Sequence, residues 1–77
     1  MKVLLNQYSD IKNVCELCSK FSDDVYATSG KFRVNAKSLL GLLSLDLSKE
    51  IDLVIDTYRD DVIMDFRNEV NAVLQRS

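Results

Sequence analysis

The chain has no histidine, proline or tryptophan, and only two glycines and two cysteines among its 77 residues. Two cysteines without histidine do not complete the four ligands of a structural zinc site. Without proline, and with so little glycine, long irregular loops and linkers are not expected. We therefore predict a single domain over residues 1–77 that holds neither a metal nor a cofactor.

The sequence also lacks long apolar runs and a basic stripe. No run approaches the roughly 20 apolar residues that span a bilayer, and the opening MKVLLNQYSD has no signal-peptide core. The ten lysines and arginines are scattered and the net charge is −2, so direct nucleic-acid binding is not expected. With 47% hydrophobic and 29% charged residues, we expect a globular cytoplasmic protein without membrane contact.

Apolar periodicity predicts four strands and three helices. The expected strands are Lys2–Leu5, Val25–Thr28, Phe32–Asn35 and Glu50–Thr57. A first helix is expected to be capped by Ser9 and to end at 22–24, with its apolar face formed by Ile11, Val14, Cys15, Cys18 and Phe21. A short helix follows Ser38. A last helix begins at Asp60 or Asp61, ends near Arg76, and carries an inner stripe of Val62, Ile63, Phe66, Val70, Val73 and Leu74.

The order of these elements is β-α-β-β-α-β-α. Ser29-Gly30-Lys31 predicts a tight turn between the second and third strands, because glycine takes a positive φ without strain. Three amphipathic helices on one face of a four-stranded antiparallel sheet would bury every apolar stripe. The sequence therefore predicts an α+β, open-faced β-sandwich.

The segment from Ser29 to Asp56 resembles HPr, the phosphocarrier of the bacterial sugar phosphotransferase system. The resemblance extends over about residues 14–74, and its motifs are Gly30-Lys31, Val34-Asn35, Lys37-Ser38, Gly41 and Ser44-Leu45. It implies the HPr-like open-faced fold. HPr carries its phosphoryl group on a histidine at the start of the first helix, and counting back from Ser19-Lys20-Phe21 places Gln7 there. Glutamine cannot accept a phosphoryl group, so phosphocarrier activity is not expected.

Catabolite-repression HPr-like proteins, a branch of this family, carry glutamine in place of the histidine and keep a regulatory serine. The resemblance implies the same role for Ser38, with a serine kinase and a transcription regulator as protein partners. Ser38 also has a purely structural interpretation, since serine before a helix is a preferred N-cap. A phosphate there would meet free N–H groups beside Lys37.

Four leucines within the five residues of the short helix cannot all face inward. The resemblance assigns Leu40 and Leu43, with Leu39 beside them, to a partner-binding patch next to Ser38 and Lys37. The alternatives are that they belong to the core, or that a homodimer covers them. The leading prediction is a non-enzymatic regulatory or interaction domain, and the alternative is a self-associating adaptor without phosphorylation.

Cys15 and Cys18 form a C-x-x-C motif, which in thiol–disulfide enzymes opens a helix. Here both cysteines lie inside the predicted first helix, on its apolar stripe. We therefore interpret them as small buried hydrophobic residues, and thiol redox activity is the third and weakest hypothesis. The carboxylate pairs at 23–24 and 60–61 are interpreted as helix-end residues.

Overall fold

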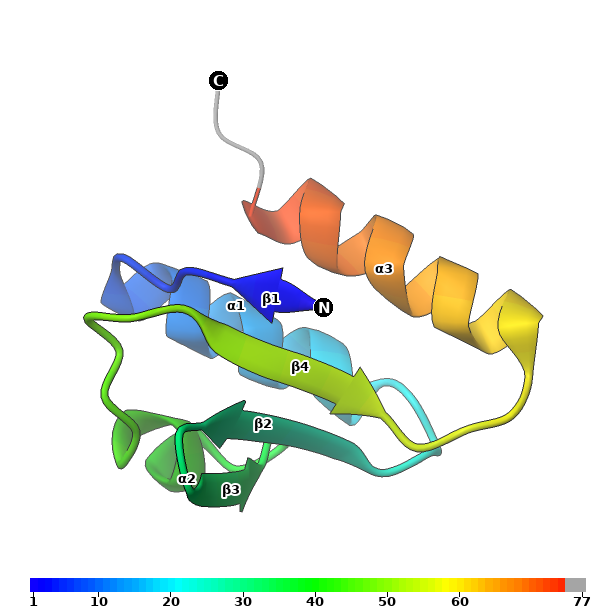
Figure 1. Ribbon diagram of the computed structural model, residues 1–77. Helices are drawn as coiled ribbons and strands as arrows, with labels where there is room; N and C mark the ends of the chain where they lie inside the picture. The colour runs from blue at the N-terminus through cyan, green and yellow to red at the C-terminus, as the bar shows by residue number, and fades with distance from the viewer. Residues whose placement is uncertain (75–77) are drawn as a thin grey trace.

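The computed structural model describes residues 1–74 and contains the predicted four strands and three helices in the predicted order (Figure 1). The strands are β1 (Lys2–Val3), β2 (Val25–Ser29), β3 (Phe32–Asn35) and β4 (Ile51–Ile55). The helices are α1 (Tyr8–Ser19), α2 (Leu39–Leu43) and α3 (Asp60–Leu74). Arg76, which was expected at the end of the last helix, lies outside the described residues.

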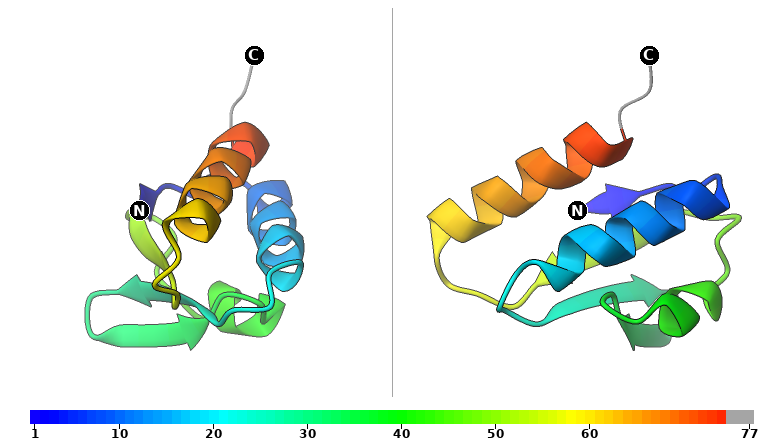
Figure 2. Two further views of the ribbon diagram at one scale, coloured as in Figure 1. Left: turned by 90° about the vertical axis from the view of Figure 1, so that its right-hand side faces the viewer. Right: turned by 180° about the vertical axis from the view of Figure 1, so that it is seen from behind.

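The four strands form one antiparallel sheet in the order β1-β4-β2-β3. All three helices lie on the same side of this sheet, and the opposite face is open (Figure 2). On the open face the guanidinium of Arg33 lies 3.7 Å from the ring centroid of Tyr26, a cation–π contact between neighbouring strands. The predicted open-faced α+β sandwich is confirmed.

A two-residue turn joins β2 and β3. Ser29 pairs with Phe32, and Gly30 between them has a φ of +59°. No other described residue has a positive φ, so Lys31 does not, and this combination is that of a type II′ turn. The turn matches the right-handed twist of the strands and fixes the register of the hairpin.

The first helix begins earlier than predicted, because Gln7 rather than Ser9 is its N-cap. The backbone N–H of Gln7 donates to the carboxylate of Asp10 at 3.2 Å, one half of a capping box. The side chain of Asp10 is buried as a result, with 3% of its surface exposed. The helix ends at Ser19, so Phe21 packs from the following loop rather than from the helix.

The core lies between the sheet and the helices. From α1 it takes Ile11, Val14, Leu17 and Cys18, so Leu17 replaces Cys15 in the fully buried part of the predicted stripe. From α3 only Phe66 and Val70 are fully buried, and the rest of that stripe is partly buried. The rings of Phe66 and Phe21 meet edge to face, with centroids 5.4 Å apart. This contact fastens α3 to the segment after α1.

Two strands are shorter than predicted. β1 ends at Val3 although Leu5 is also buried, and β4 covers Ile51–Ile55 rather than Glu50–Thr57. Periodicity follows burial, whereas strand bounds follow hydrogen bonds, and the two differ where the chain leaves the sheet. The short β1 leaves part of the edge of β4 uncovered.

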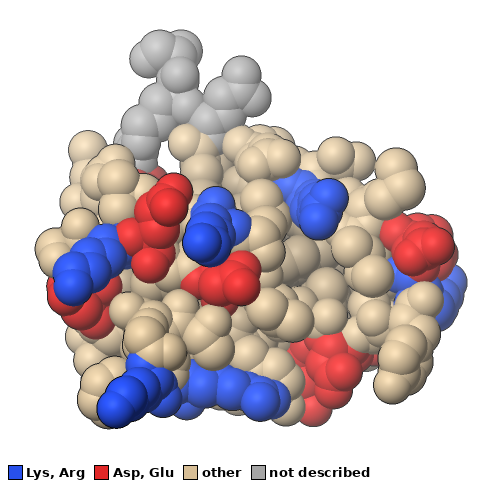
Figure 3. All heavy atoms as spheres, viewed as in Figure 1, with Lys and Arg blue, Asp and Glu red and all other residues tan. Residues whose placement is uncertain are grey.

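Charged side chains of both signs are interspersed over the face seen in Figure 3, and neither sign gathers into a stripe there. Within residues 1–74, no helix combines the length and the apolar character that crossing a bilayer requires. This face therefore carries mixed charge rather than a basic stripe of the kind that binds nucleic acids.

Candidate functional site

Ser38 is the N-cap of α2, as its structural interpretation predicted. Its Oγ accepts the backbone N–H of Gly41 at 3.1 Å, and its own N–H donates to the carbonyl of Asn35 at 3.0 Å. The hydroxyl therefore satisfies one of the N–H groups that the first turn of a helix leaves without a partner. A group attached to Oγ would therefore lie next to the backbone N–H groups of this turn.

The segment before Ser38 is held by three other hydrogen bonds. The side chain of Asn35 accepts the N–H of Lys37 at 2.9 Å, an Asx-type turn. The N–H of Ala36, which is fully buried, donates to the carbonyl of Val25 at 2.9 Å. The thiol of Cys15 donates to the carbonyl of Lys37 at 3.3 Å. Ser38 thus stands on a segment tied to both β2 and α1.

The ammonium of Lys37 is bound to the carbonyl of Phe21 at 2.7 Å. Carbonyl groups beyond the end of a helix have no intrahelical partner, and a lysine is a common way to satisfy them. The ammonium of Lys37, which the sequence analysis expected beside Ser38, therefore binds the segment that follows α1. It would have to leave Phe21 before it could pair with a phosphate.

Gly41 lets α2 lie close to this segment. A Cβ at that position would lie 3.3 Å from the carbonyl oxygen of Asn35 and 3.3 Å from both Cβ and Oγ of Ser38. These distances are shorter than ordinary van der Waals contacts, so any larger residue would push against the cap. The glycine of the family-like motif therefore has a packing role beside Ser38.

The four leucines of α2 divide as the sequence required. Leu42 is fully buried and Leu39 packs partly against the core, whereas Leu40 is 81% exposed and Leu43 is 42% exposed. Leu40 leaves most of its apolar surface in water, and covering such a side chain with a partner contributes about 1.5–3 kcal/mol. Leu40 and Leu43 stand on the surface beside Ser38. That they bind a partner stays a prediction.

Phe32 is a further exposed apolar side chain that the sequence analysis did not single out. It is 72% exposed, and it lines with Ser44, at the end of α2, a hollow of about 400 Å³. The signal was available in the hairpin: Phe32 pairs with Ser29, and residues opposite one another share a face of the sheet. This places Phe32 on the side of the helices, although only a short helix stands near it.

The start of α1 has no histidine that could carry a phosphoryl group. Gln7 occupies the N-cap, and the nearby carboxylate of Asp10 is buried in the capping box. Within residues 1–74, no three side chains of the metal-binding types lie close enough to hold an ion. The exposed Asp61 instead pairs with Arg59 at 2.8 Å, and this hydrogen bond lowers the pKa of Asp61.

Both cysteines are free, and their surroundings keep them protonated. Burial, with a smaller contribution from Cys15 nearby, raises the pKa of Cys18 from 9.0 to about 12. Burial and the charge of Glu16 also raise the pKa of Cys15. Reactive cysteines in thiol–disulfide enzymes have lowered pKa values, because only the thiolate attacks. Cys18 is therefore the buried residue that the sequence predicted, whereas Cys15 is only partly buried.

We expect Cys18 to resist iodoacetamide at pH 7 in the folded protein and to react once the chain is unfolded in urea. A thiol whose pKa is raised on folding stabilises the fold below its unfolded value of about 9. That contribution is lost as the pH rises from about 9 toward 12. Mass spectrometry of the alkylated protein, folded and unfolded, measures the difference, and rapid alkylation of folded Cys18 would contradict it.

Comparison with known proteins assigns this geometry to a family. A sequence model described as the phosphorylation site of the PTS HPr component matches residues 11–65. The chain belongs to the HPr family. Ser38 and α2 lie inside the matched range, whereas Gln7 precedes it. HPr proteins are phosphocarriers rather than catalytic enzymes. No curated protein sequence matches the chain.

Two solved structures share the HPr fold with this chain. One is the catabolite-repression protein Crh of Bacillus subtilis, described as an intertwined dimer with a swapped domain; it is 22% identical, with a TM-score of 0.64 over 91% of this chain and 84% of Crh. The other is the histidine-containing phosphocarrier protein of a mycoplasma, 14% identical, with a TM-score of 0.69 over 100% of this chain and 98% of the other. At these identities the similarity establishes the fold.

Proposed function

We propose that this HPr-family protein is a non-catalytic regulatory or protein-interaction domain that acts through α2 and is controlled by phosphorylation of Ser38. The observation that carries the proposal is the exposure of Leu40 beside a serine whose hydroxyl caps the same helix. The chain has no histidine, so no phosphohistidine can form on it. A serine kinase and a transcription regulator are the partners that the family suggests.

The chemistry of the cap supports control at this position. A phosphate on Ser38 adds about 1.5 to 2 negative charges at pH 7 and three acceptor oxygens. The N–H of Gly41 already points at Oγ and would donate to one of these oxygens. Because Leu40 lies two residues away, the charge would stand at the rim of the apolar surface and change which partner can dock.

The test is incubation of the protein with ATP and a kinase that phosphorylates HPr on serine, followed by measurement of the intact mass. We expect the addition of one phosphate, and no addition to Ser38→Ala. Loss of the cap lowers the stability of that variant by about 1 kcal/mol, so circular dichroism must first confirm that it is folded. An unmodified wild-type mass, or equal modification of Ser38→Ala, would exclude the regulatory site.

A second candidate is an HPr-fold adaptor that self-associates through α2 without phosphorylation. The exposure of Leu40 and Leu43 favours it as well, since a second copy could cover both side chains. Light scattering separates the two candidates. A dimer that dissociates in Leu40→Asp, in a protein that the kinase leaves unmodified, would favour the adaptor.

A further inference from the structure

The edge of β4 is only partly covered by β1. The two strands pair at Lys2 with Asp52 and at Val3 with Ile51, and the carbonyl of Met1 accepts the N–H of Leu53 at 2.8 Å. β4 continues for two more residues, and Figure 1 shows it running past the start of β1. An uncovered strand edge presents backbone groups that can pair with another chain.

The uncovered edge carries a backbone donor at Ile55. In an antiparallel ladder, successive residues direct their N–H and C=O groups to opposite edges. Since Leu53 bonds to Met1 on the β1 side, Ile55 faces that side too. Its carbonyl accepts the N–H of Thr57 at 3.1 Å, but none of residues 1–74 provides a backbone acceptor for its N–H. This is the bond that an additional strand would make.

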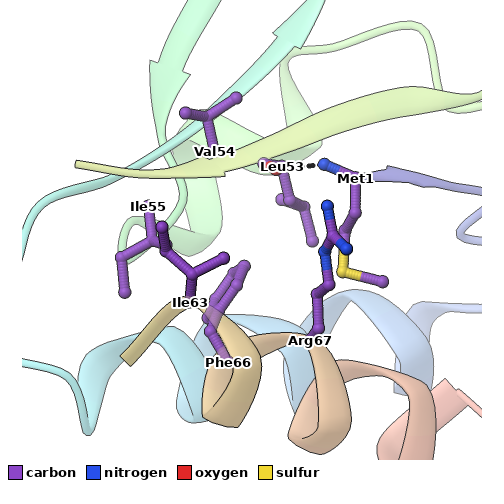
Figure 4. Close-up of a pocket in the computed structure, with 7 residues that line it drawn as sticks. All are labelled: Met1, Leu53, Val54, Ile55, Ile63, Phe66 and Arg67. Carbon is purple, nitrogen blue, oxygen red and sulfur yellow. Dashed lines mark hydrogen bonds between the residues drawn. The ribbon is translucent and has the colours of Figure 1, made fainter. Parts of the chain in front are cut away.

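An apolar cavity of about 200 Å³ lies directly beside this edge, between β4 and α3 (Figure 4). It is lined by Leu53, Ile55, Ile63 and Phe66, together with Met1, Val54 and Arg67. A cavity of about 150 Å³ holds a benzene molecule, so this one has room for a large apolar side chain. It is too small for the cofactors and drug-sized ligands that need about 300 Å³ or more.

Arg67 supplies a cation at the rim of the cavity. Figure 4 shows its side chain extending from α3 alongside Met1 toward β4. Arg67 is exposed, and it makes no ion pair within the described part of the chain, in contrast to Arg59, which pairs with Asp61. A guanidinium at the mouth of an apolar cavity favours a ligand that combines an apolar group with a carboxylate.

We propose that this edge binds an extended, carboxylate-bearing segment of a partner protein, which adds to the sheet as a strand beside the end of β4. Residues opposite one another share a face of the sheet. The residue opposite Ile55 would therefore turn its side chain toward α3, into the cavity, while the N–H of Ile55 donates to its carbonyl. The carboxylate pairs with Arg67. This mode is strand addition, in which backbone bonds give affinity and pockets give specificity.

Charge favours a different protein over a second copy of this chain as the added strand. The two edge strands of this sheet are β1 and β3, which carry Lys2 and Arg33 and no acidic residue. Neither strand could supply the carboxylate that pairs with Arg67. An acidic segment of another protein is complementary in charge to Arg67, whereas the edge strands of this chain are not.

The test is a titration of the 15N-labelled full chain, followed by 1H–15N spectra. The probe is an acetylated hexapeptide of alternating threonine and valine that ends in leucine with a free carboxylate. We expect saturable shifts, with the amide of Ile55 moving downfield as it gains an acceptor. Loss of one charge-assisted bond in Arg67→Gln should weaken binding about tenfold, whereas Arg59→Gln should leave it unchanged.

Two further peptides identify the source of the carboxylate. The amidated hexapeptide should bind about tenfold more weakly if the chain end pairs with Arg67. An amidated peptide with glutamate as its last residue should restore binding if a side chain serves. No saturable shift at Ile55, equal binding of the free-carboxylate peptide to the wild type and to Arg67→Gln, or shifts that grow with protein concentration alone would overturn the proposal. Leu40→Asp should not affect this binding, which separates it from the function proposed for α2.

Discussion

Replacement of Phe66 by alanine is expected to lower the free energy of unfolding by about 3–5 kcal/mol. Phe66 is 2% exposed on the inner face of α3, and its ring meets Phe21 edge to face at 5.4 Å. Truncation removes this contact and leaves a cavity in the core where the ring lay. Domains of this size are stabilised by about 0.05–0.15 kcal/mol per residue, so the loss is a large part of the total.

Urea denaturation followed by circular dichroism measures this effect. The matched control is Met64→Ala, on the same helix but 64% exposed, which should change stability by no more than about 0.5 kcal/mol. If Phe66→Ala proves unfolded in water, Phe66→Leu gives a smaller loss that can be measured. Equal midpoints for Phe66→Ala and Met64→Ala would show that α3 does not depend on this ring.

The order of the elements could be predicted because local patterns determine it. The turn at Gly30 requires a positive φ, and the alternation along Ile51–Ile55 buries every second residue, as the structure shows. Three amphipathic helices and four short strands then have few arrangements that bury every apolar stripe. The HPr family model, which matches residues 11–65, is consistent with this order of elements.

The details of helix capping could not be predicted from the same patterns. Ser9 has the preferred residue type for an N-cap, but Gln7 takes the position because Asp10, three residues later, completes a capping box. This box also explains why Asp10 is buried. Leu17 was missed although it lies three residues after Val14 and therefore on the same face of the helix.

The candidate site was predicted in part. The capping role of Ser38 follows from residue type and position, whereas the bond between Lys37 and the carbonyl of Phe21 joins residues 16 positions apart. No local pattern encodes such a contact. The cavity beside Arg67 is likewise formed by segments distant in sequence, and the sequence, which predicted a longer first strand, contained no signal of it. Such contacts between distant residues can be identified only once the three-dimensional fold is known.

Leu40 and Leu42 give the sharpest separation of surface from core, because they lie two residues apart on the same short helix. Leu42 is fully buried, so Leu42→Ala should lower the free energy of unfolding by about 2–5 kcal/mol. Leu40 is 81% exposed, and Leu40→Ala should change it by no more than about 0.5 kcal/mol. Urea denaturation of both variants checks this contrast.

The same pair tests the proposed role of α2. A kinase that modifies Ser38 is expected to dock over this helix, and truncation of a hot-spot residue in an interface costs 2 kcal/mol or more, about 30-fold in affinity. Leu40→Asp should therefore slow phosphorylation of Ser38 at sub-saturating protein by at least about tenfold while the protein stays folded. Lys49→Asp, a charge change on the loop after α2, serves as the control. An unchanged rate in Leu40→Asp would leave the exposed leucine without a part in kinase docking, and the self-associating adaptor would then account for it better.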